Sequence, residues 1–186
     1  MLYAQTHLTL PAWVHSEVDT ARVYSDDEAK VALAIHLSHL NVEHASGGPF
    51  GAAVFDGSGR LLAVGVNRVV PQTCSVAHAE MMAYMTAQSR TQRARLNENG
   101  DHIVLASSAQ PCCMCYGATF WAGIDELLIG ASAADVMELT EFDEGPLPSD
   151  WIGELERRGI AVRHGILRES AREVLRTYGE SGAKHY

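Results

Sequence analysis

Two short motifs constrain this fold most, because each places metal-ligand side chains at the expected start of a helix. The first is His78-Ala79-Glu80, and the second is Pro111-Cys112-Cys113-Met114-Cys115. Cys112 and Cys115 are three positions apart, so both sulfurs lie on one face of a helix. Unpaired amides and the positive dipole end of a helix start favour thiolates there. The chain is therefore expected to bring two helix starts together around one metal ion.

One imidazole and two thiolates, from His78, Cys112 and Cys115, make three zinc ligands and leave the fourth position open for water. Zinc lowers the pKa of such a water to about 7. Glu80 is two residues from His78, so it can stand beside the water and carry protons without binding the metal. The alternative is a closed structural site with Cys113 or Cys74 as fourth ligand. It is disfavoured because the neighbouring Cys112 and Cys113 point in different directions on a helix.

Composition narrows the class of protein. A chain of 186 residues with 47% hydrophobic and 20% charged residues predicts one globular domain, or a domain with an arm. The formal charge of −9 argues against general binding of nucleic-acid phosphates. Three of the four cysteines fall within four positions, which cannot form a framework of separated disulfides and indicates metal or redox chemistry in a reducing compartment. We see no secretory signal and no run of about eighteen apolar residues, so a cytoplasmic protein is expected.

Strands and helices alternate after an opening hairpin, which predicts an α/β fold: an α/β/α sandwich with a mixed sheet. Residues 1–24 lack periodicity and are expected to form an N-terminal arm, followed by one domain over 25–186. A capping box formed by Ser25 and Glu28 is expected to open the first helix, and Pro111 is expected to begin a later one. Strands are expected at 50–56, 61–68, 103–106, 126–130 and 160–167, and helices at about 25–46, 77–92, from 111, 134–139, 152–158 and 169–178.

The H-x-E … P-C-x-x-C combination is the signature of zinc-dependent nucleobase deaminases, and with it the chain resembles the cytidine and deoxycytidylate deaminase superfamily. The match looks closest to the small zinc-dependent bacterial guanine deaminases. That resemblance implies a cytidine deaminase-like fold with a five-stranded sheet, one zinc ion per subunit and a homodimer. It also implies a substrate-closing C-terminal tail.

Four further segments carry the narrower resemblance. It implies that Phe50 lines the base pocket, that Asn67 hydrogen-bonds the purine, that Glu144 in the 142–146 loop anchors guanine, and that Tyr186 belongs to the closing tail. Ala79, Asp143 and Trp121 complete the candidate substrate-binding residues, with Phe50 and Trp121 offering flat faces for stacking.

Each of these residues also has a plainer interpretation: Phe50 as core, Trp121 as core or dimer interface, Glu144 as a solvated acid and Tyr186 as a frayed end. The chain departs from the family pattern at two places. Gln110 stands where relatives usually have glutamate, and Glu141 stands where guanine deaminases usually have glycine. Both departures leave the zinc set untouched.

The hypothesis is hydrolytic deamination of guanine to xanthine and ammonia. In it, zinc-bound water loses a proton to Glu80 and attacks the carbon that bears the amino group. Alternatives are a deaminase of another small molecule such as ammeline, cytosine or guanosine, a tRNA adenosine deaminase, and a zinc module without activity. The negative charge and the 142–146 loop argue against the tRNA enzyme.

Overall fold

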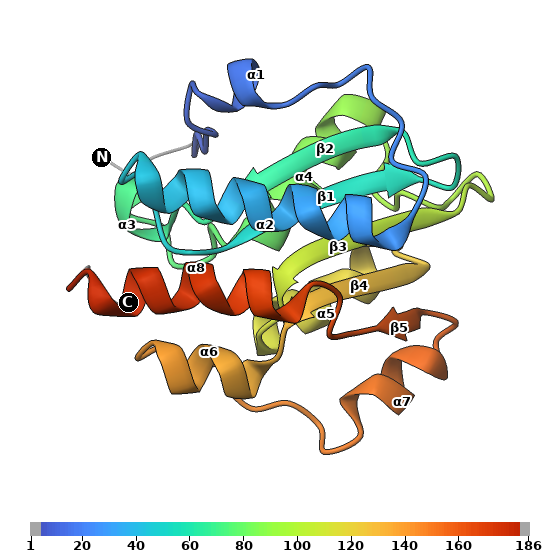
Figure 1. Cartoon of the computed structure of the whole chain (residues 1–186). Coiled ribbons are helices and arrows are strands. Elements are labelled where there is room, and N and C mark those ends of the chain that lie inside the picture. Colours follow the sequence, from blue (N-terminus) through green and yellow to red (C-terminus); the bar gives the residue numbers. More distant parts are fainter. Residues whose placement is uncertain (1–4, 183–186) are drawn as a thin grey trace.

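The computed structural model describes residues 5–182, which build one five-stranded mixed sheet (Figure 1). The strand order is β2-β1-β3-β4-β5. β1 pairs antiparallel with both β2 and β3, whereas β3, β4 and β5 run parallel. The strands are β1 (Gly51–Asp56), β2 (Leu61–Val66), β3 (Ile103–Ala109), β4 (Glu126–Ala131) and β5 (Ala161–Arg163). The predicted mixed sheet is confirmed.

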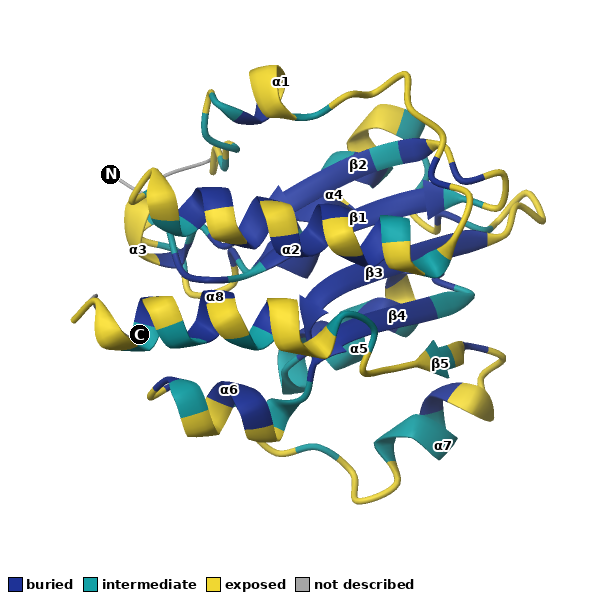
Figure 2. Ribbon diagram, viewed as in Figure 1, coloured by how far each residue is buried: buried dark blue, intermediate teal, exposed yellow. Residues whose placement is uncertain are grey.

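Helices cover both faces of the sheet, so that three layers result. One face carries α2 (Asp27–Glu43) and α8 (Arg168–Glu180), with α6 (Ala133–Leu139) beside α8, and the other carries α4 (Ala79–Thr91) and α5 (Cys113–Ala122) (Figure 1). Side chains alternate along β1: Phe55 joins the core under α2, and Val54 joins the core under α4. Strands β1 to β4 and the inward faces of the helices are largely buried, whereas β5 at the edge of the sheet is mostly exposed (Figure 2). Short helices α1 (Val14–Glu17), α3 (Val69–Gln72) and α7 (Trp151–Glu156) lie in the connections.

The topology gathers the candidate residues at one edge of the sheet. Because β1 runs antiparallel to its neighbours, its first residue lies at the same edge as the last residues of β2 and β3. Phe50 precedes β1, Asn67 follows β2, and the 110–112 segment follows β3. Residues far apart in the chain thus meet without any long loop.

Several local predictions are corrected by the structure. Ser25 does not cap α2: Asp26 does, accepting a hydrogen bond from the Ala29 amide at 2.7 Å. Pro111 does not begin α5, because Cys112 is the N-cap and the helix begins at Cys113. The last strand spans only Ala161–Arg163, not 160–167, and α1 and α3 were not predicted. Among the described helices, none is long and apolar enough to cross a membrane.

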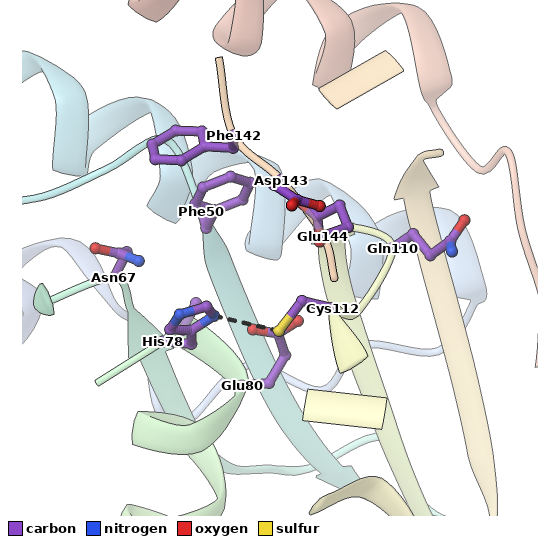
Figure 3. A pocket seen from close by; sticks show the side chains of 10 residues that line it. Phe50, Asn67, His78, Glu80, Gln110, Cys112, Phe142, Asp143 and Glu144 are labelled. Atoms are coloured by element: carbon purple, nitrogen blue, oxygen red, sulfur yellow. Dashed lines mark hydrogen bonds between the residues drawn. The ribbon is translucent and has the colours of Figure 1, made fainter. Parts of the chain in front are cut away.

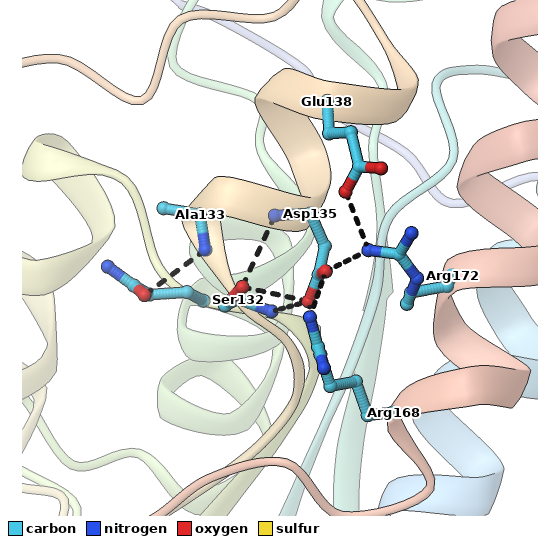
Figure 4. A network of polar contacts seen from close by, with 7 residues as sticks. Ser132, Ala133, Asp135, Glu138, Arg168 and Arg172 are labelled. Carbon is cyan, nitrogen blue, oxygen red and sulfur yellow. Dashed lines mark hydrogen bonds and ion pairs between the residues drawn. The ribbon is translucent and has the colours of Figure 1, made fainter.

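A buried carboxylate ties α6 to α8 (Figure 4). Asp135 is 1% exposed and accepts hydrogen bonds from Arg168 Nε at 2.8 Å, from Arg172 Nη1, and from the Ser132 amide at 2.8 Å. These partners, the Arg168 hydrogen bond foremost, hold the pKa of Asp135 well below its ordinary value. The charged form is therefore the one that stabilises the fold.

Asp135→Asn is expected to lower the free energy of unfolding by about 2–3 kcal/mol, because two guanidinium groups lose a charged partner. For a chain of this size the melting temperature should fall by about 5–10 °C. Since the folded-state pKa is lowered, this stabilisation is present above about pH 4 and disappears as the pH falls further. Thermal melts from pH 3 to 8 should therefore show the gap between wild type and variant narrowing in acid. The exposed neighbour Glu138 provides the control, and Glu138→Gln should leave the melting temperature nearly unchanged. The gap for Asp135→Asn should narrow between pH 6 and pH 3 without vanishing, because the lowered pKa keeps Asp135 largely ionised in the folded protein at pH 3, and a gap that does not narrow at all would contradict this account.

Candidate active site

Two helix starts bring the three predicted metal ligands together. His78 is the N-cap of α4, Cys112 is the N-cap of α5, and Cys115 lies in the first turn of α5. Cys112 Sγ lies 3.5 Å from His78 Nδ1, and the candidate ligand atoms of all three side chains are within 4.8 Å of one another. Within residues 5–182, this is the only such cluster of His, Cys, Asp or Glu.

A glycine makes this approach possible. A β-carbon at Gly65 in β2 would lie 2.0 Å from the Ala79 carbonyl oxygen, so any larger residue would push the start of α4 away from the sheet. The His-Cys-Cys donor set is one that zinc prefers, and it supplies three of the four ligands of a tetrahedral site. Neither Cys74 nor Cys113 joins the cluster. The residues present therefore fit zinc. They fill three of its four coordination positions and leave the fourth for a ligand that is not one of the described residues.

The electrostatics of the cluster favour a metal-binding thiolate. A hydrogen bond from Cys115, together with one from His78, lowers the pKa of Cys112 to about 4. Burial alone would lower the pKa of His78, but the Cys112 hydrogen bond and the Glu80 charge raise it. Cys115 is fully buried, and its pKa is raised, first by its hydrogen bond to Cys112. One thiolate is thus already preferred before a metal binds.

Glu80 occupies the floor of the site. It lies in the first turn of α4 and is 6% exposed. Burial and the negative charge of Cys112 raise the pKa of its carboxyl group to about 7. A carboxyl group with a pKa near neutrality can both accept and donate a proton under ordinary conditions.

These side chains form one wall of a pocket of about 120 Å³ (Figure 3). Residues next to the start of β1 and the end of β2, together with the loop after α6, complete the lining (Figure 3). The pocket is lined by Phe50, Asn67, His78, Ala79, Glu80, Gln110, Cys112, Phe142, Asp143 and Glu144. Eight of the residues predicted from the sequence to bind substrate, zinc or protons thus share one cavity: Phe50, Asn67, His78, Ala79, Glu80, Cys112, Asp143 and Glu144.

The backbone fixes Glu144 next to the zinc ligands. The Cys113 amide, at the start of α5, donates to the Glu144 carbonyl oxygen at 2.9 Å. The Glu144 side chain faces the pocket, where burial, followed by the Cys112 and Glu80 charges, raises the pKa of its carboxyl group to about 8. A desolvated carboxyl group of this kind gains most from a ligand that brings N–H donors to it.

Asn67 is fully buried and its side-chain amide has a defined orientation. Its Oδ1 accepts from the Val69 amide at 3.2 Å and from the Gly48 amide at 3.4 Å. The Nδ2 atom is therefore the one turned toward the pocket, as Figure 3 shows. Asn67 presents a hydrogen-bond donor, whereas Glu144 across the pocket presents an acceptor.

Two pocket residues, Phe142 and Gln110, were not among the predicted site residues. Phe142 packs against Phe50 edge to face, with ring centroids 5.2 Å apart, so the two rings form the apolar wall together. Gln110 holds the zinc-binding segment: its amide donates to the Ala131 carbonyl oxygen at 2.8 Å, and its Oε1 accepts from the Ala133 amide at 3.2 Å. Phe142 directly precedes Asp143 and Glu144 in the sequence, and this adjacency is the one signal that could have placed it in the pocket.

Among the described candidate substrate-binding residues, Trp121 does not line this pocket. Trp121 is 74% exposed, because it lies eight residues beyond the start of α5 and on its outer face. Tyr186 lies outside the described residues, so its predicted role is untested. Glu141, the departure from the family pattern, is exposed and outside the pocket.

Comparison with known proteins gives a consistent result. Residues 24–131 match the model of the cytidine and deoxycytidylate deaminase zinc-binding region. Guanine deaminase of Bacillus subtilis is 33% identical over 142 residues, which cover 76% of this chain and 87% of that protein.

Solved structures show a higher similarity. The structure of guanine deaminase from Nitrosomonas europaea has 41% identity and a TM-score of 0.90, with 97% of this chain and 99% of that one covered. A structure of a mutant of the same Nitrosomonas protein in complex with 8-azaguanine has 41% identity and a TM-score of 0.89. It covers 95% of this chain and 98% of that one.

Proposed function

The chain belongs to the cytidine and deoxycytidylate deaminase zinc-binding family, and from this premise we propose that it hydrolyses guanine to xanthine and ammonia. The observation that carries the proposal is one small pocket that brings Glu80, Glu144 and Asn67 together beside the His-Cys-Cys cluster. Guanine deaminase from Nitrosomonas europaea is similar over nearly the whole chain, and that from Bacillus subtilis over three quarters of it, which supports this substrate over other amino-bearing bases.

His78, Cys112 and Cys115 would hold the zinc. When bound, zinc would act as a Lewis acid. It would lower the pKa of the attacking water toward neutrality and stabilise negative charge that develops on oxygen. Glu80 takes a proton from the attacking water, delivers it to a ring nitrogen of guanine, and then passes a proton to the departing amine. A C–O bond forms and the C–N bond at carbon 2 breaks, with one water consumed and one ammonia released.

Recognition follows from the two polar groups, Glu144 and Asn67, that share the pocket with the metal site. Guanine has adjacent N–H donors at its ring nitrogen and its amino group, and Glu144 can accept from this edge with charge assistance. Asn67 Nδ2 can donate to an acceptor nitrogen or oxygen on the purine. Phe50 and Phe142 contribute an aromatic wall beside the base. Asp143 and Ala79 complete the lining.

We also expect the protein to act as a homodimer. The outer face of α5 leaves Trp121 74% exposed, and Met85 on the adjacent α4 is 38% exposed. Large apolar side chains on two neighbouring helices favour burial against a second copy. Sedimentation analysis at micromolar concentration should give twice the chain mass, and Trp121→Glu should shift the species toward monomer.

The substrate is tested by ammonia release from a panel of guanine, guanosine, cytosine, adenine and ammeline, together with a tRNA substrate. Guanine should have the highest kcat/KM, because its adjacent N–H donors match Glu144 and, unlike guanosine, it carries no sugar that must enter a pocket of about 120 Å³. A higher kcat/KM for cytosine or ammeline would show that guanine is not the preferred substrate, while the assignment of hydrolytic deamination would stand. Salt-sensitive turnover of tRNA would support the tRNA enzyme instead. Zinc binding without any turnover would support a non-enzymatic module.

A further inference from the structure

The N-terminal arm, residues 5–24, is linked to the pocket by a chain of hydrogen bonds. Trp13 Nε1 donates to Ser46 Oγ at 3.0 Å, and Ser46 Oγ donates to Asn41 Oδ1 at 2.7 Å. Asn41 Nδ2 then donates to the Asn67 carbonyl oxygen at 3.0 Å and to the Gly48 carbonyl oxygen at 2.8 Å. Three side chains thus connect the arm to the backbone of the residue that faces the substrate.

The last hydrogen bonds of this series lie where a small shift of the backbone would alter the Asn67 amide. Asn41 and Asn67 are both fully buried, so their polar atoms have no water to replace a lost partner. The backbone passes so close that a β-carbon at Gly47 would lie 1.8 Å from the Asn67 carbonyl oxygen. Gly48 also donates its amide to Asn67 Oδ1. Any movement of residues 46–48 therefore changes both the backbone and the side-chain amide of Asn67.

A second connection joins the arm to the same loop. Arg68, next to Asn67, donates through Nε to the Thr9 carbonyl oxygen at 3.2 Å and through Nη1 to the Ser46 carbonyl oxygen. The Trp13 ring stacks on His44 at the end of α2, with centroids 5.5 Å apart. Val14, beside Trp13, is 6% exposed and belongs to the core under α2. The arm is therefore anchored at Val14, contacts the 44–48 loop directly through Trp13, and is joined to the same loop a second time through Thr9 and Arg68.

We propose that the N-terminal arm is a positioning element of the active site, which acts through Trp13, Ser46 and Asn41 to hold the Asn67 amide in its substrate-binding orientation. The identity of the substrate in this statement rests on the proposed function. The arm touches no reacting atom, so it affects how well the base is bound and oriented and leaves proton transfer by Glu80 unchanged. The predicted signature is a change in KM with little change in kcat.

Trp13 is the residue to substitute in the test, because replacing the buried Asn41 would endanger folding. Trp13→Ala removes both the indole N–H and the ring stacking, and it should raise KM for guanine and Kd for 8-azaguanine about three- to tenfold, with kcat changed less than twofold. Trp13→Phe keeps a ring on His44 but lacks the donor, so it should give a smaller change in the same direction. Ser46→Thr, which keeps the hydroxyl group, should remain closer to wild type than Ser46→Ala.

Ser16→Ala is the matched control. Ser16 Oγ donates only within the arm, to the Trp13 carbonyl oxygen at 2.9 Å, so its loss should leave KM and Kd unchanged. Hydrogen exchange gives a readout independent of turnover: the amides of Gly48 and Val69 should exchange faster in Trp13→Ala than in wild type. Faster exchange in a protein that does not deaminate guanine would support the arm's role and refute the proposed function. Unchanged KM, Kd and exchange in both Trp13 variants would overturn the inference.

Discussion

Glu80→Gln should reduce kcat for guanine by about 10²- to 10⁴-fold while zinc content stays at one ion per chain. The reason is that glutamine keeps the size and polarity of Glu80 but cannot carry a proton between water, ring and amine. Glu80 does not belong to the His-Cys-Cys cluster, so metal retention should be unaffected. Steady-state kinetics together with metal analysis by mass spectrometry measures both quantities on the same preparation.

The matched control is Glu43→Gln on α2. Glu43 is 61% exposed, pairs with His39 and does not line the pocket, so its substitution should leave kcat and zinc content at wild-type values. A robustly active Glu80→Gln protein would rule out Glu80 as the proton carrier. Loss of zinc in that variant would instead place Glu80 among the groups that hold the metal.

Glu144→Gln should lower kcat/KM for guanine by about 10- to 100-fold, the range expected for losing one hydrogen-bond partner that carries charge. The melting temperature should stay equal or rise slightly, because the variant removes a desolvated carboxyl group whose pKa is raised to about 8. The effect on turnover should therefore exceed any effect on folding. Measuring kcat/KM and thermal melts of the two proteins in parallel separates these effects.

Glu141→Gln is the control within the same loop. Glu141 is exposed and does not line the pocket, so its substitution should change kcat/KM less than twofold. If Glu144→Gln behaved like Glu141→Gln, Glu144 would be a solvated acid of the loop, and guanine would need another acceptor.

The zinc cluster and its surroundings could be predicted because their signals are local. His78, Cys112 and Cys115 can be identified by residue type and by their position at expected helix starts. Any fold in which all three bind one metal ion must bring those helix starts together. The alternation of apolar segments likewise predicted the mixed sheet and the helices of both faces. Glu144 and Asn67 came from the resemblance to guanine deaminases, since neither stands in a motif with its own chemistry.

The contacts that the sequence analysis missed are tertiary ones. No pattern places Phe142 against Phe50, since their pairing depends on how the loop after α6 crosses the end of β1. Trp121 was expected near the base because of its residue type, but the length of α5 carries it to the surface. The N-terminal arm had no periodicity to interpret, and its connection to Asn67 passes through Ser46 and Asn41, which belong to another segment. Capping by Asp26 in place of Ser25 shows that two adjacent cap residues compete through geometry that the sequence does not display.

The most direct test of the central claim is the product analysis of guanine incubated with zinc-loaded protein in water enriched in ¹⁸O. The account predicts xanthine and ammonia in a one-to-one ratio, with one ¹⁸O atom in the new carbonyl group at carbon 2. It also predicts loss of activity after chelation and its return when zinc is restored. Guanine that remains intact under these conditions, with zinc bound and the protein folded, would contradict the assignment of this pocket to guanine deamination.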